Sequence, residues 1–198
     1  MRRGYVRHLH LPGSLPLTSA IRFMQRSELE HLIRASGEIA ADDEIIIIGS
    51  QAILGQFPDA PVRLLSSMEA DVYPKNHPER ADKVDSAIGE GSSFHELHGY
   101  YAQGVGKQTA VLPVDWQSRL IAVRNENTNG VTGYCLEVHD LAISKIIAMR
   151  PKDLKFVQEL VRHDMIDKKT MLGRLKQTDL EESIRRTARA RIKSFFKS

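Results

Sequence analysis

Glu69 and Asp71 are the side chains of this sequence whose types and spacing most clearly suggest chemistry. They lie within residues 68–73, where polar and apolar residues alternate, and this alternation predicts a strand. Residues two apart on a strand point to the same face, so we expect the two carboxylates to project together, with their Cα atoms about 6 to 7 Å apart. Such a pair can share Mg²⁺ or Mn²⁺ with the oxygens of a triphosphate. A half-exposed strand with an acidic outer face is the alternative interpretation.

Gly49 and Ser50 follow a β-branched run that predicts a buried strand over 44–48. A short helix is predicted over 50–56, so the pair lies at a strand-to-helix turn. Glycine lets the backbone approach a phosphate closely, and the start of a helix supplies free N–H groups to it. The Ser50 hydroxyl can bond a phosphate oxygen, or it can act only as the cap of the helix.

Lys145 lies among apolar residues in a helix predicted over 141–149. A lysine in such a place either extends along apolar surface to solvent or points into a polar cleft. A cleft that holds a metal and a triphosphate would require a cation there. Arg150, Lys152 and Asp153 gather at the junction to the next helix, where charges that complement the helix dipoles are an equally good interpretation.

The composition predicts an ordinary globular protein. The chain has 198 residues, 41% hydrophobic and 27% charged, with a formal net charge of +3. Its single cysteine, Cys135, excludes an internal disulfide framework and a cysteine-rich zinc site. No run approaches the ~18 apolar residues of a membrane span. The N-terminus lacks the apolar core of a signal peptide. We therefore expect a cytoplasmic protein with no membrane partner.

Hydrophobic periodicity divides the chain into an α/β part and a helical part. Helices are predicted from an N-cap at Ser27, and over 79–88, 141–149, 151–163, 168–176 and 179–196. Strands are predicted over 44–48, 68–73, 109–112, 120–123 and 134–138, with further strand character at Tyr100 and Tyr101. The predicted fold class is therefore α/β (α+β), with a mixed sheet followed by an all-helical C-terminal part.

Three ranges describe the predicted organisation. Residues 1–22 contain proline and glycine without a clear period and are expected to be a flexible arm. Residues 23–138 form the α/β core, and residues 139–198 form a helical region that completes the site. The sequence leaves open whether translation starts at Met1 or Met24.

The two constellations, in this order, resemble a known family. Gly49-Ser50 followed by Ser67-x-Glu69-x-Asp71 is similar to the glycine-serine and paired-carboxylate motifs of DNA polymerase β-type nucleotidyltransferases. The run 139–145 with 150–153 resembles the later motifs of the abortive-infection (AbiEii-like) toxin branch. The resemblance covers about residues 45–160, and it implies a polymerase β-like nucleotidyltransferase core.

The resemblance also implies roles and partners. Glu69 and Asp71 would hold magnesium, Lys145 would approach the phosphates, and Asp153 would orient it or complete the site. Nucleotide binding would fall to the remaining residues of the two motifs, namely Gly49, Ser50, Ser67 and Arg150, together with Lys145. The expected activity is the Mg-dependent transfer of a nucleoside monophosphate from a nucleoside triphosphate to an RNA (tRNA-like) or protein acceptor. A toxin role in a toxin–antitoxin or phage-defence system would bring a cognate antitoxin as a partner.

Two departures from the family pattern support a different class of function. The first metal-binding position is Glu69, where aspartate is more usual, and its longer side chain would shift the metal geometry. A third carboxylate, common on a later strand, has only Asp115 and Glu137 as candidates. The alternative is therefore a catalytically inactive nucleotidyltransferase-like module that binds nucleotide or RNA. A purely structural protein would bind no nucleotide at all.

Two further groups of residues have weaker signals. His95 and His98 are three apart and would form a metal pair on a helix, but no third ligand for zinc is evident. Four arginines near the C-terminus are suited to RNA phosphates or to a solvated helix face: Arg185, Arg186, Arg189 and Arg191.

Overall fold

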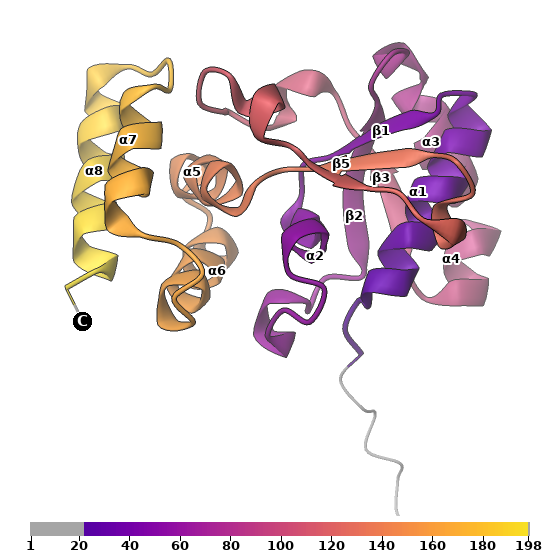
Figure 1. The fold of residues 1–198 in the computed structure, drawn as a ribbon, viewed down its shortest axis with the longest axis horizontal. Coiled ribbons are helices and arrows are strands. Elements are labelled where there is room, and N and C mark those ends of the chain that lie inside the picture. Colours follow the sequence, from indigo (N-terminus) through magenta and orange to yellow (C-terminus); the bar gives the residue numbers. More distant parts are fainter. Residues whose placement is uncertain (1–21, 198) are drawn as a thin grey trace, which may run out of the picture.

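The computed structural model describes residues 22–197, and its centre is a five-stranded mixed sheet (Figure 1). The strand order is β3-β2-β1-β5-β4. β1 runs antiparallel to β2 and parallel to β5, β2 is parallel to β3, and β4 is antiparallel to β5. The strands are β1 (Glu44–Ile47), β2 (Glu69–Pro74), β3 (Tyr101–Gly104), β4 (Ile121–Val123) and β5 (Thr132–Cys135). The predicted arm over 1–22 lies outside the described residues, apart from residue 22.

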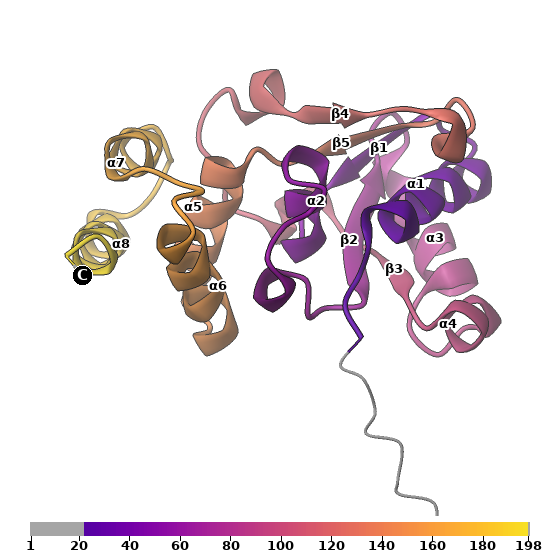
Figure 2. The ribbon, with the colours of Figure 1, turned by 60° about the horizontal axis from the view of Figure 1, so that its bottom comes forward.

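One face of the sheet is covered by α1 (Arg26–Ala40), α2 (Ile53–Gln56) and α3 (Ala81–Ile88) (Figure 2). Ile33 of α1 packs so closely on Gly133 of β5 that an added Cβ would lie 2.3 Å from it. Ala70 and Val72 of β2 are fully buried on this face. Because side chains alternate along a strand, the residues between them point to the opposite face.

The N-terminus of α1 differs from the prediction. Ser27 is not the N-cap, because the helix begins at Arg26 and the cap is Gln25. The Glu28 carboxylate accepts a hydrogen bond from the Gln25 backbone N–H at 2.8 Å, which satisfies a donor that the first turn would leave free.

The predicted strand over 109–112 is wrong. Lys107–Thr109 form a 3₁₀ turn, and residues 110–115 pair with no strand among the described residues. The strand predicted over 134–138 ends instead at Cys135, because Glu137 caps a helix that starts at Val138. Helix α4 (Ser93–His98) carries no long apolar stripe and is absent from the predicted elements.

Four helices follow the sheet, as predicted: α5 (Val138–Ala148), α6 (Pro151–Arg162), α7 (Lys168–Lys176) and α8 (Glu182–Phe195). Figure 1 shows α5 and α6 next to the α/β part, with α7 and α8 beyond them. α5 is central because it packs against α6, α7 and α8 and also against α2. The mixed α+β fold with a helical C-terminal part is thereby confirmed, whereas its division into the three predicted ranges stays a prediction.

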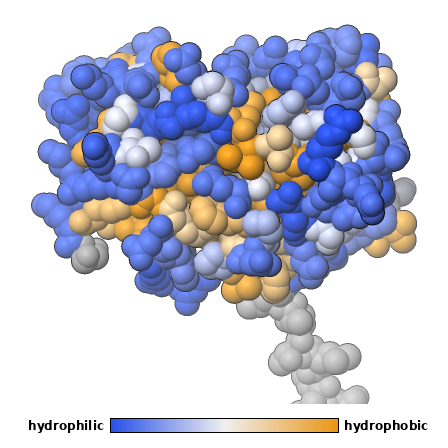
Figure 3. Space-filling view, in the orientation of Figure 1, coloured by the Kyte–Doolittle hydropathy of each residue, from blue (hydrophilic) through white to orange (hydrophobic). Residues whose placement is uncertain are grey.

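The face of the molecule seen in Figure 3 is largely hydrophilic, with apolar side chains in a patch near the middle and in a band toward the lower left. Among residues 22–197, no helix is both long and apolar enough to cross a membrane.

Candidate active site

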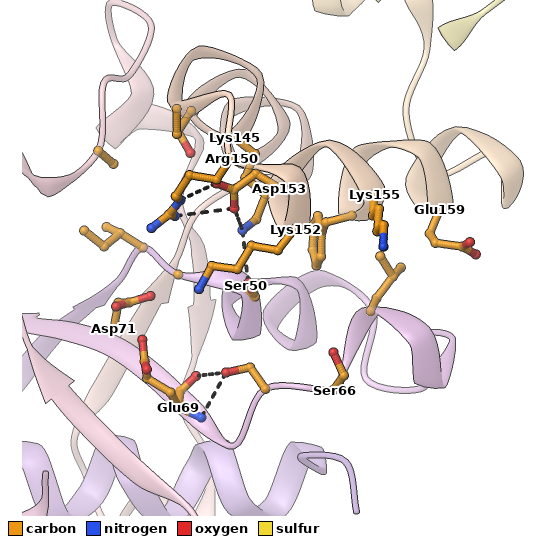
Figure 4. A pocket seen from close by; sticks show the side chains of 18 of the residues that line it. Ser50, Ser66, Glu69, Asp71, Lys145, Arg150, Lys152, Asp153, Lys155 and Glu159 are labelled. Atoms are coloured by element: carbon orange, nitrogen blue, oxygen red, sulfur yellow. Dashed lines mark hydrogen bonds and ion pairs between the residues drawn. The ribbon is translucent and has the colours of Figure 1, made fainter. Parts of the chain in front are cut away.

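A cavity of about 810 Å³ lies between the open face of β2 and the helices α5 and α6 (Figure 4). Every residue predicted for the site lines it. They come from the end of β1, from β2 and its approach, and from the two helices: Gly49, Ser50, Ser67, Glu69, Asp71, Lys145, Arg150 and Asp153. The fold therefore brings together two constellations that lie almost a hundred residues apart in the chain.

Gly49 lets the carboxylate of Asp71 lie directly against the turn after β1. A Cβ at residue 49 would sit 1.8 Å from Asp71 Oδ2, a distance that no side chain tolerates. The Ile48 N–H also bonds the Asp71 backbone oxygen at 3.0 Å. The absence of a side chain at Gly49 thus lets the Asp71 carboxylate lie against the backbone of the turn. From the sequence we also expect it to let a phosphate come close to this backbone.

The carboxylates of Glu69 and Asp71 are half-buried on the open face of β2. Burial, together with the neighbouring Glu69 carboxylate, raises the pKa of Asp71 to about 6, although Lys145 and Lys152 act in the opposite direction. Neither carboxylate forms an ion pair with a side chain in the described part of the chain. The pair therefore presents concentrated negative charge that a divalent cation would neutralise, so these residues fit Mg²⁺ or Mn²⁺.

Tyr101, which the sequence motifs do not mark, lies beside this pair. It stands opposite Glu69 in the parallel β2–β3 register, and its hydroxyl donates a hydrogen bond to Glu69 Oε2 at 3.0 Å. Burial and this hydrogen bond raise the pKa of Tyr101, so its hydroxyl stays protonated and continues to donate. The only sequence signal was its place in a strand-like stretch.

Lys145 crosses from α5 to the other wall of the cavity. Its Nζ donates to Ser50 Oγ at 3.0 Å and to Asp153 Oδ1 at 3.1 Å. It also lies 4.6 Å from the centre of the Phe156 ring. Burial lowers the pKa of Lys145, and the charge of Asp153 opposes this effect. The lysine therefore points into the cleft rather than along the surface to solvent.

Asp153 is the buried anion that holds the cations of this wall in place. Arg150 Nε donates to its Oδ2 at 2.5 Å, while Lys145 occupies the other oxygen. Burial would raise the pKa of Asp153, but the hydrogen bonds and charges of Arg150 and Lys145 outweigh burial and lower it. Asp153 is therefore already neutralised within the protein, unlike Asp71.

Ser67 shapes the start of β2. Its hydroxyl accepts a hydrogen bond from the Glu69 N–H at 3.2 Å, and its carbonyl accepts one from Gln51 Nε2 at 2.7 Å. Gln51 follows Ser50 and is fully buried. These bonds fix the Ser50 turn and the approach to Glu69 relative to each other.

Lys152 is a cavity residue to which the motifs assign no role. It is exposed, and Figure 4 shows its amino group reaching toward Ser50 and Asp71. Its side chain has no hydrogen-bond or ion-pair partner within residues 22–197. Lys155 and Arg63 line a more distant part of the same cavity. The signal that could have identified Lys152 is its place between Arg150 and Asp153.

Neither candidate for a third carboxylate lies at the cavity. Glu137 accepts hydrogen bonds from the backbone N–H groups of His139 and Asp140 and so caps α5. Asp115 precedes a 3₁₀ turn and is exposed. On β3, the residues opposite Glu69 and Asp71 are Tyr101 and Gln103, which are not acidic. Within the described chain, no third acid stands beside the pair.

The remaining candidates have other surroundings. His95 packs on Tyr101, and His98 packs on His31 and Phe94. The described residues contain no group of three or more side chains that could hold a metal through histidine, cysteine or acids. Arg185 donates to the backbone oxygens of Leu175 and Thr178 and so serves the α7–α8 turn, whereas Arg186 and Arg189 are exposed.

Comparison with known proteins assigns the chain to a family. No curated protein and no solved structure matches it significantly. The model of a family described as "Nucleotidyltransferase of unknown function (DUF6036)" matches residues 27–196. The match covers most of the chain, including the whole cavity and the four C-terminal helices. The chain therefore belongs to this family of nucleotidyltransferases of unknown function.

Proposed function

We propose that this protein is a Mg²⁺- or Mn²⁺-dependent nucleotidyltransferase that transfers a nucleoside monophosphate from a nucleoside triphosphate to a hydroxyl group of an RNA. The observation that carries the proposal is the division of charge in the cavity. Glu69 and Asp71 lie on one wall and form no ion pair within residues 22–197, and Lys145 and Lys152 lie across from them. A metal-bound triphosphate is an anion with a cation at one side, and this division of charge complements it.

In this proposal, the triphosphate lies between the Ser50 turn and α6. Lys145 is held on Ser50 and Asp153, so it offers a fixed positive charge to the phosphates. The Ser50 hydroxyl accepts from Lys145 and keeps its own proton to donate to a phosphate oxygen. Lys152 would contact the phosphates directly. Arg150 neutralises Asp153 and leaves Lys145 more positive toward the ligand. Gly49 and Ser67 shape the turn and the start of β2.

Glu69 and Asp71 would hold the divalent cation, which supplies charge neutralisation of the phosphates and activation of the attacking hydroxyl when bound. The oxygen of the acceptor hydroxyl forms a bond to the α-phosphorus, and the bond from this phosphorus to the bridging oxygen breaks. Pyrophosphate leaves with the electron pair of that bond. The hydroxyl proton passes to water or to a carboxylate of the pair, since the described part of the chain places no third acid beside the pair.

An RNA acceptor is supported by the cations beyond the triphosphate position. Lys155 lines the far part of the cavity, and so does Arg63, which pairs with Glu159 at 3.4 Å. Side chains of this type bind the phosphates of nucleic acids. A protein acceptor carries no row of phosphates and would not require cationic side chains at this place.

We further propose that the protein acts as the toxin of a toxin–antitoxin or phage-defence system. This role implies a cytoplasmic location and a cognate antitoxin as a partner. Its support is the likeness of residues 139–145 and 150–153 to the motifs of the AbiEii-like branch. Expression of the protein is then expected to arrest growth, and Asp71→Ala is expected to abolish the arrest.

The direct test is the incubation of the protein with each α-labelled nucleoside triphosphate, Mg²⁺ or Mn²⁺ and total RNA. We expect label in RNA with one or a few nucleotides. Asp71→Ala and Lys145→Ala should each lower the rate by at least about 100-fold, because each removes a group that stabilises charge in the transition state. Asp82→Asn, which changes an exposed carboxylate on α3, is the matched control and should keep full activity.

Undiminished label transfer by Asp71→Ala would contradict the proposed site. Label found only on protein would replace the RNA acceptor with a protein one.

A second candidate, an inactive module that binds nucleotide or RNA, is favoured by one observation. No third acid lies beside Glu69 and Asp71 in the described chain, and Glu69 replaces the more usual aspartate. Binding of Mg-nucleotide without any labelled acceptor would support this candidate. Loss of growth arrest in Asp71→Ala would exclude it.

A further inference from the structure

Tyr101 holds one of the two carboxylates of the site through a direct hydrogen bond. It lies opposite Glu69 in the β2–β3 register, and its hydroxyl donates to Glu69 Oε2 at 3.0 Å. This bond takes up one oxygen of the carboxylate. The other oxygen, Oε1, accepts from no N–H or hydroxyl group among the described residues, and the Asp71 carboxyl lies within hydrogen-bonding reach of the Glu69 carboxylate, so a metal bound through Oε1 would take the place of that contact.

The bond matters because glutamate has one more rotatable bond than aspartate. A free Glu69 would sample several side-chain conformations, and only some of them place its carboxylate near Asp71. A donor fixed on the neighbouring strand selects among these conformations. Hydrogen bonds to metal-ligating carboxylates orient them in the same way in known metal sites.

Tyr101 is itself held in place by α4. The His95 ring packs on the Tyr101 ring with their centres 4.6 Å apart. His95 Nδ1 accepts a hydrogen bond from the Gly91 N–H at 3.0 Å. The Ser92 hydroxyl caps the helix by accepting from the His95 N–H at 3.2 Å. The Tyr101 ring is therefore supported by α4, none of whose residues is among those that line the cavity.

We propose that Tyr101 is a positioning residue that orients Glu69 to bind a divalent cation through one oxygen, and so adapts the longer acid to a metal site shared with Asp71. The inference rests on the proposed function, because it requires that Glu69 and Asp71 bind a metal. It adds a residue and a coordination mode that the sequence motifs do not contain.

The test is a calorimetric titration of the full-length chain with Mn²⁺ alone, which needs neither nucleotide nor turnover. Tyr101→Phe keeps the ring and its packing on His95 but removes the donor. We expect this variant to bind Mn²⁺ at least about 10-fold more weakly than the wild type. Tyr134→Phe is the matched control, since the Tyr134 hydroxyl bonds Glu44 at 2.9 Å on the same sheet but outside the cavity. It should leave Mn²⁺ binding unchanged.

Glu69→Asp provides a second comparison. The shorter side chain withdraws its carboxylate from the Tyr101 hydroxyl, so Tyr101→Phe should have no further effect on Mn²⁺ affinity in the Glu69→Asp background. An equal loss in both backgrounds would mean that Tyr101 acts through the fold and would overturn the inference. Wild-type affinity in Tyr101→Phe would overturn it as well. Failure of the wild type itself to bind Mn²⁺ would instead reject the proposed metal site, and the inference with it.

Discussion

Asp71 and Asp153 line the same cavity, and their surroundings shift their pKa values in opposite directions. Burial and the Glu69 carboxylate raise the pKa of Asp71 to about 6. The pKa of Asp153 is lowered, because its hydrogen bonds to Arg150 and Lys145 outweigh burial. Asp153 thus pairs with cations of the protein itself, whereas Asp71 forms no ion pair with any described side chain. This contrast is the main reason to place the metal at Asp71.

We predict that Asp71→Asn stabilises the metal-free protein at pH 8. The folded-state pKa of Asp71 is about 6, against an ordinary value of 3.8. The folded protein therefore binds more protons than the unfolded chain between these values, and its free energy of unfolding falls as pH rises through this window. A neutral amide removes this cost, which is about 3 kcal/mol for a rise of this size in pKa. Urea unfolding with a chelator present measures it.

The same experiment near pH 4 provides the internal control for Asp71→Asn. There the wild-type carboxyl is protonated in the folded state, so the two proteins should unfold with nearly the same free energy. A variant that is less stable than the wild type at pH 8 would show that Asp71 contributes to stability and would contradict the prediction.

At the scale of the elements, the site is built from four segments that meet at the cavity. β2 presents the carboxylates, the turn after β1 presents Ser50, and α5 directs Lys145 across to it. α6 begins at Pro151 and brings Asp153 under Lys145 in its first turn. The contact between Lys145 and Ser50 joins segments 95 positions apart, so a small shift of α5 against the turn after β1 displaces the charges of the site.

We predict that Gly49→Ala disrupts the site while the fold persists. The new Cβ would lie 1.8 Å from Asp71 Oδ2 and 3.0 Å from Asp71 Cβ, so the carboxylate must move. Nucleotide transfer and Mn²⁺ binding should fall at least about 10-fold, as expected when a metal ligand is displaced. The circular dichroism spectrum should match that of the wild type.

Gly173→Ala is the matched control for this prediction. Gly173 lies in α7, and a Cβ there would meet nothing within 4 Å. Alanine at this position should stabilise the helix by about 0.5 to 1 kcal/mol and leave activity unchanged. Full Mn²⁺ affinity in Gly49→Ala would show that Asp71 is not held against the turn.

At the scale of the whole molecule, one buried carboxylate joins two of the C-terminal helices to the loop over residues 113–119, which precedes β4. Asp140 of α5 is fully buried. It accepts hydrogen bonds from Arg119 Nε at 2.8 Å and Nη2 at 3.1 Å, and it lies 3.3 Å from Arg174 Nε of α7. Arg119 also donates to the backbone oxygen of Val114 at 3.1 Å. This cluster connects α5, α7 and residues 113–119.

We predict that Asp140→Ala destabilises the protein by about 3 to 5 kcal/mol, because two guanidinium groups lose their anion. Chemical denaturation monitored by circular dichroism measures this loss. Lys75→Ala breaks the more exposed Lys75–Glu44 pair and should cost less than about 1 kcal/mol. Equal effects of the two substitutions would show that the Asp140 cluster does not hold the helices in place.

Much of the secondary structure follows from local sequence patterns. The strand predicted over 44–48 from its β-branched run and the strand predicted over 68–73 from its alternation are present in the structure as β1 and β2, and four C-terminal helices lie where the periodicity predicts them. The errors occur where local signals are weak. Residues 109–112 have strand-like composition but pair with no strand in the described chain, and α4 is too short to show a period.

The sequence by itself determined which residues could do chemistry and on which kind of element each would lie, because spacing along a strand or helix is a local property. Only the tertiary structure decided how these residues meet. Ser50 and Lys145 are 95 positions apart, and Glu69 and Tyr101 are 32 apart. Such contacts depend on strand register and helix packing, which local periodicity does not encode. For the same reason only the structure shows that Gly49 accommodates Asp71, and that a tyrosine rather than a third acid stands beside Glu69.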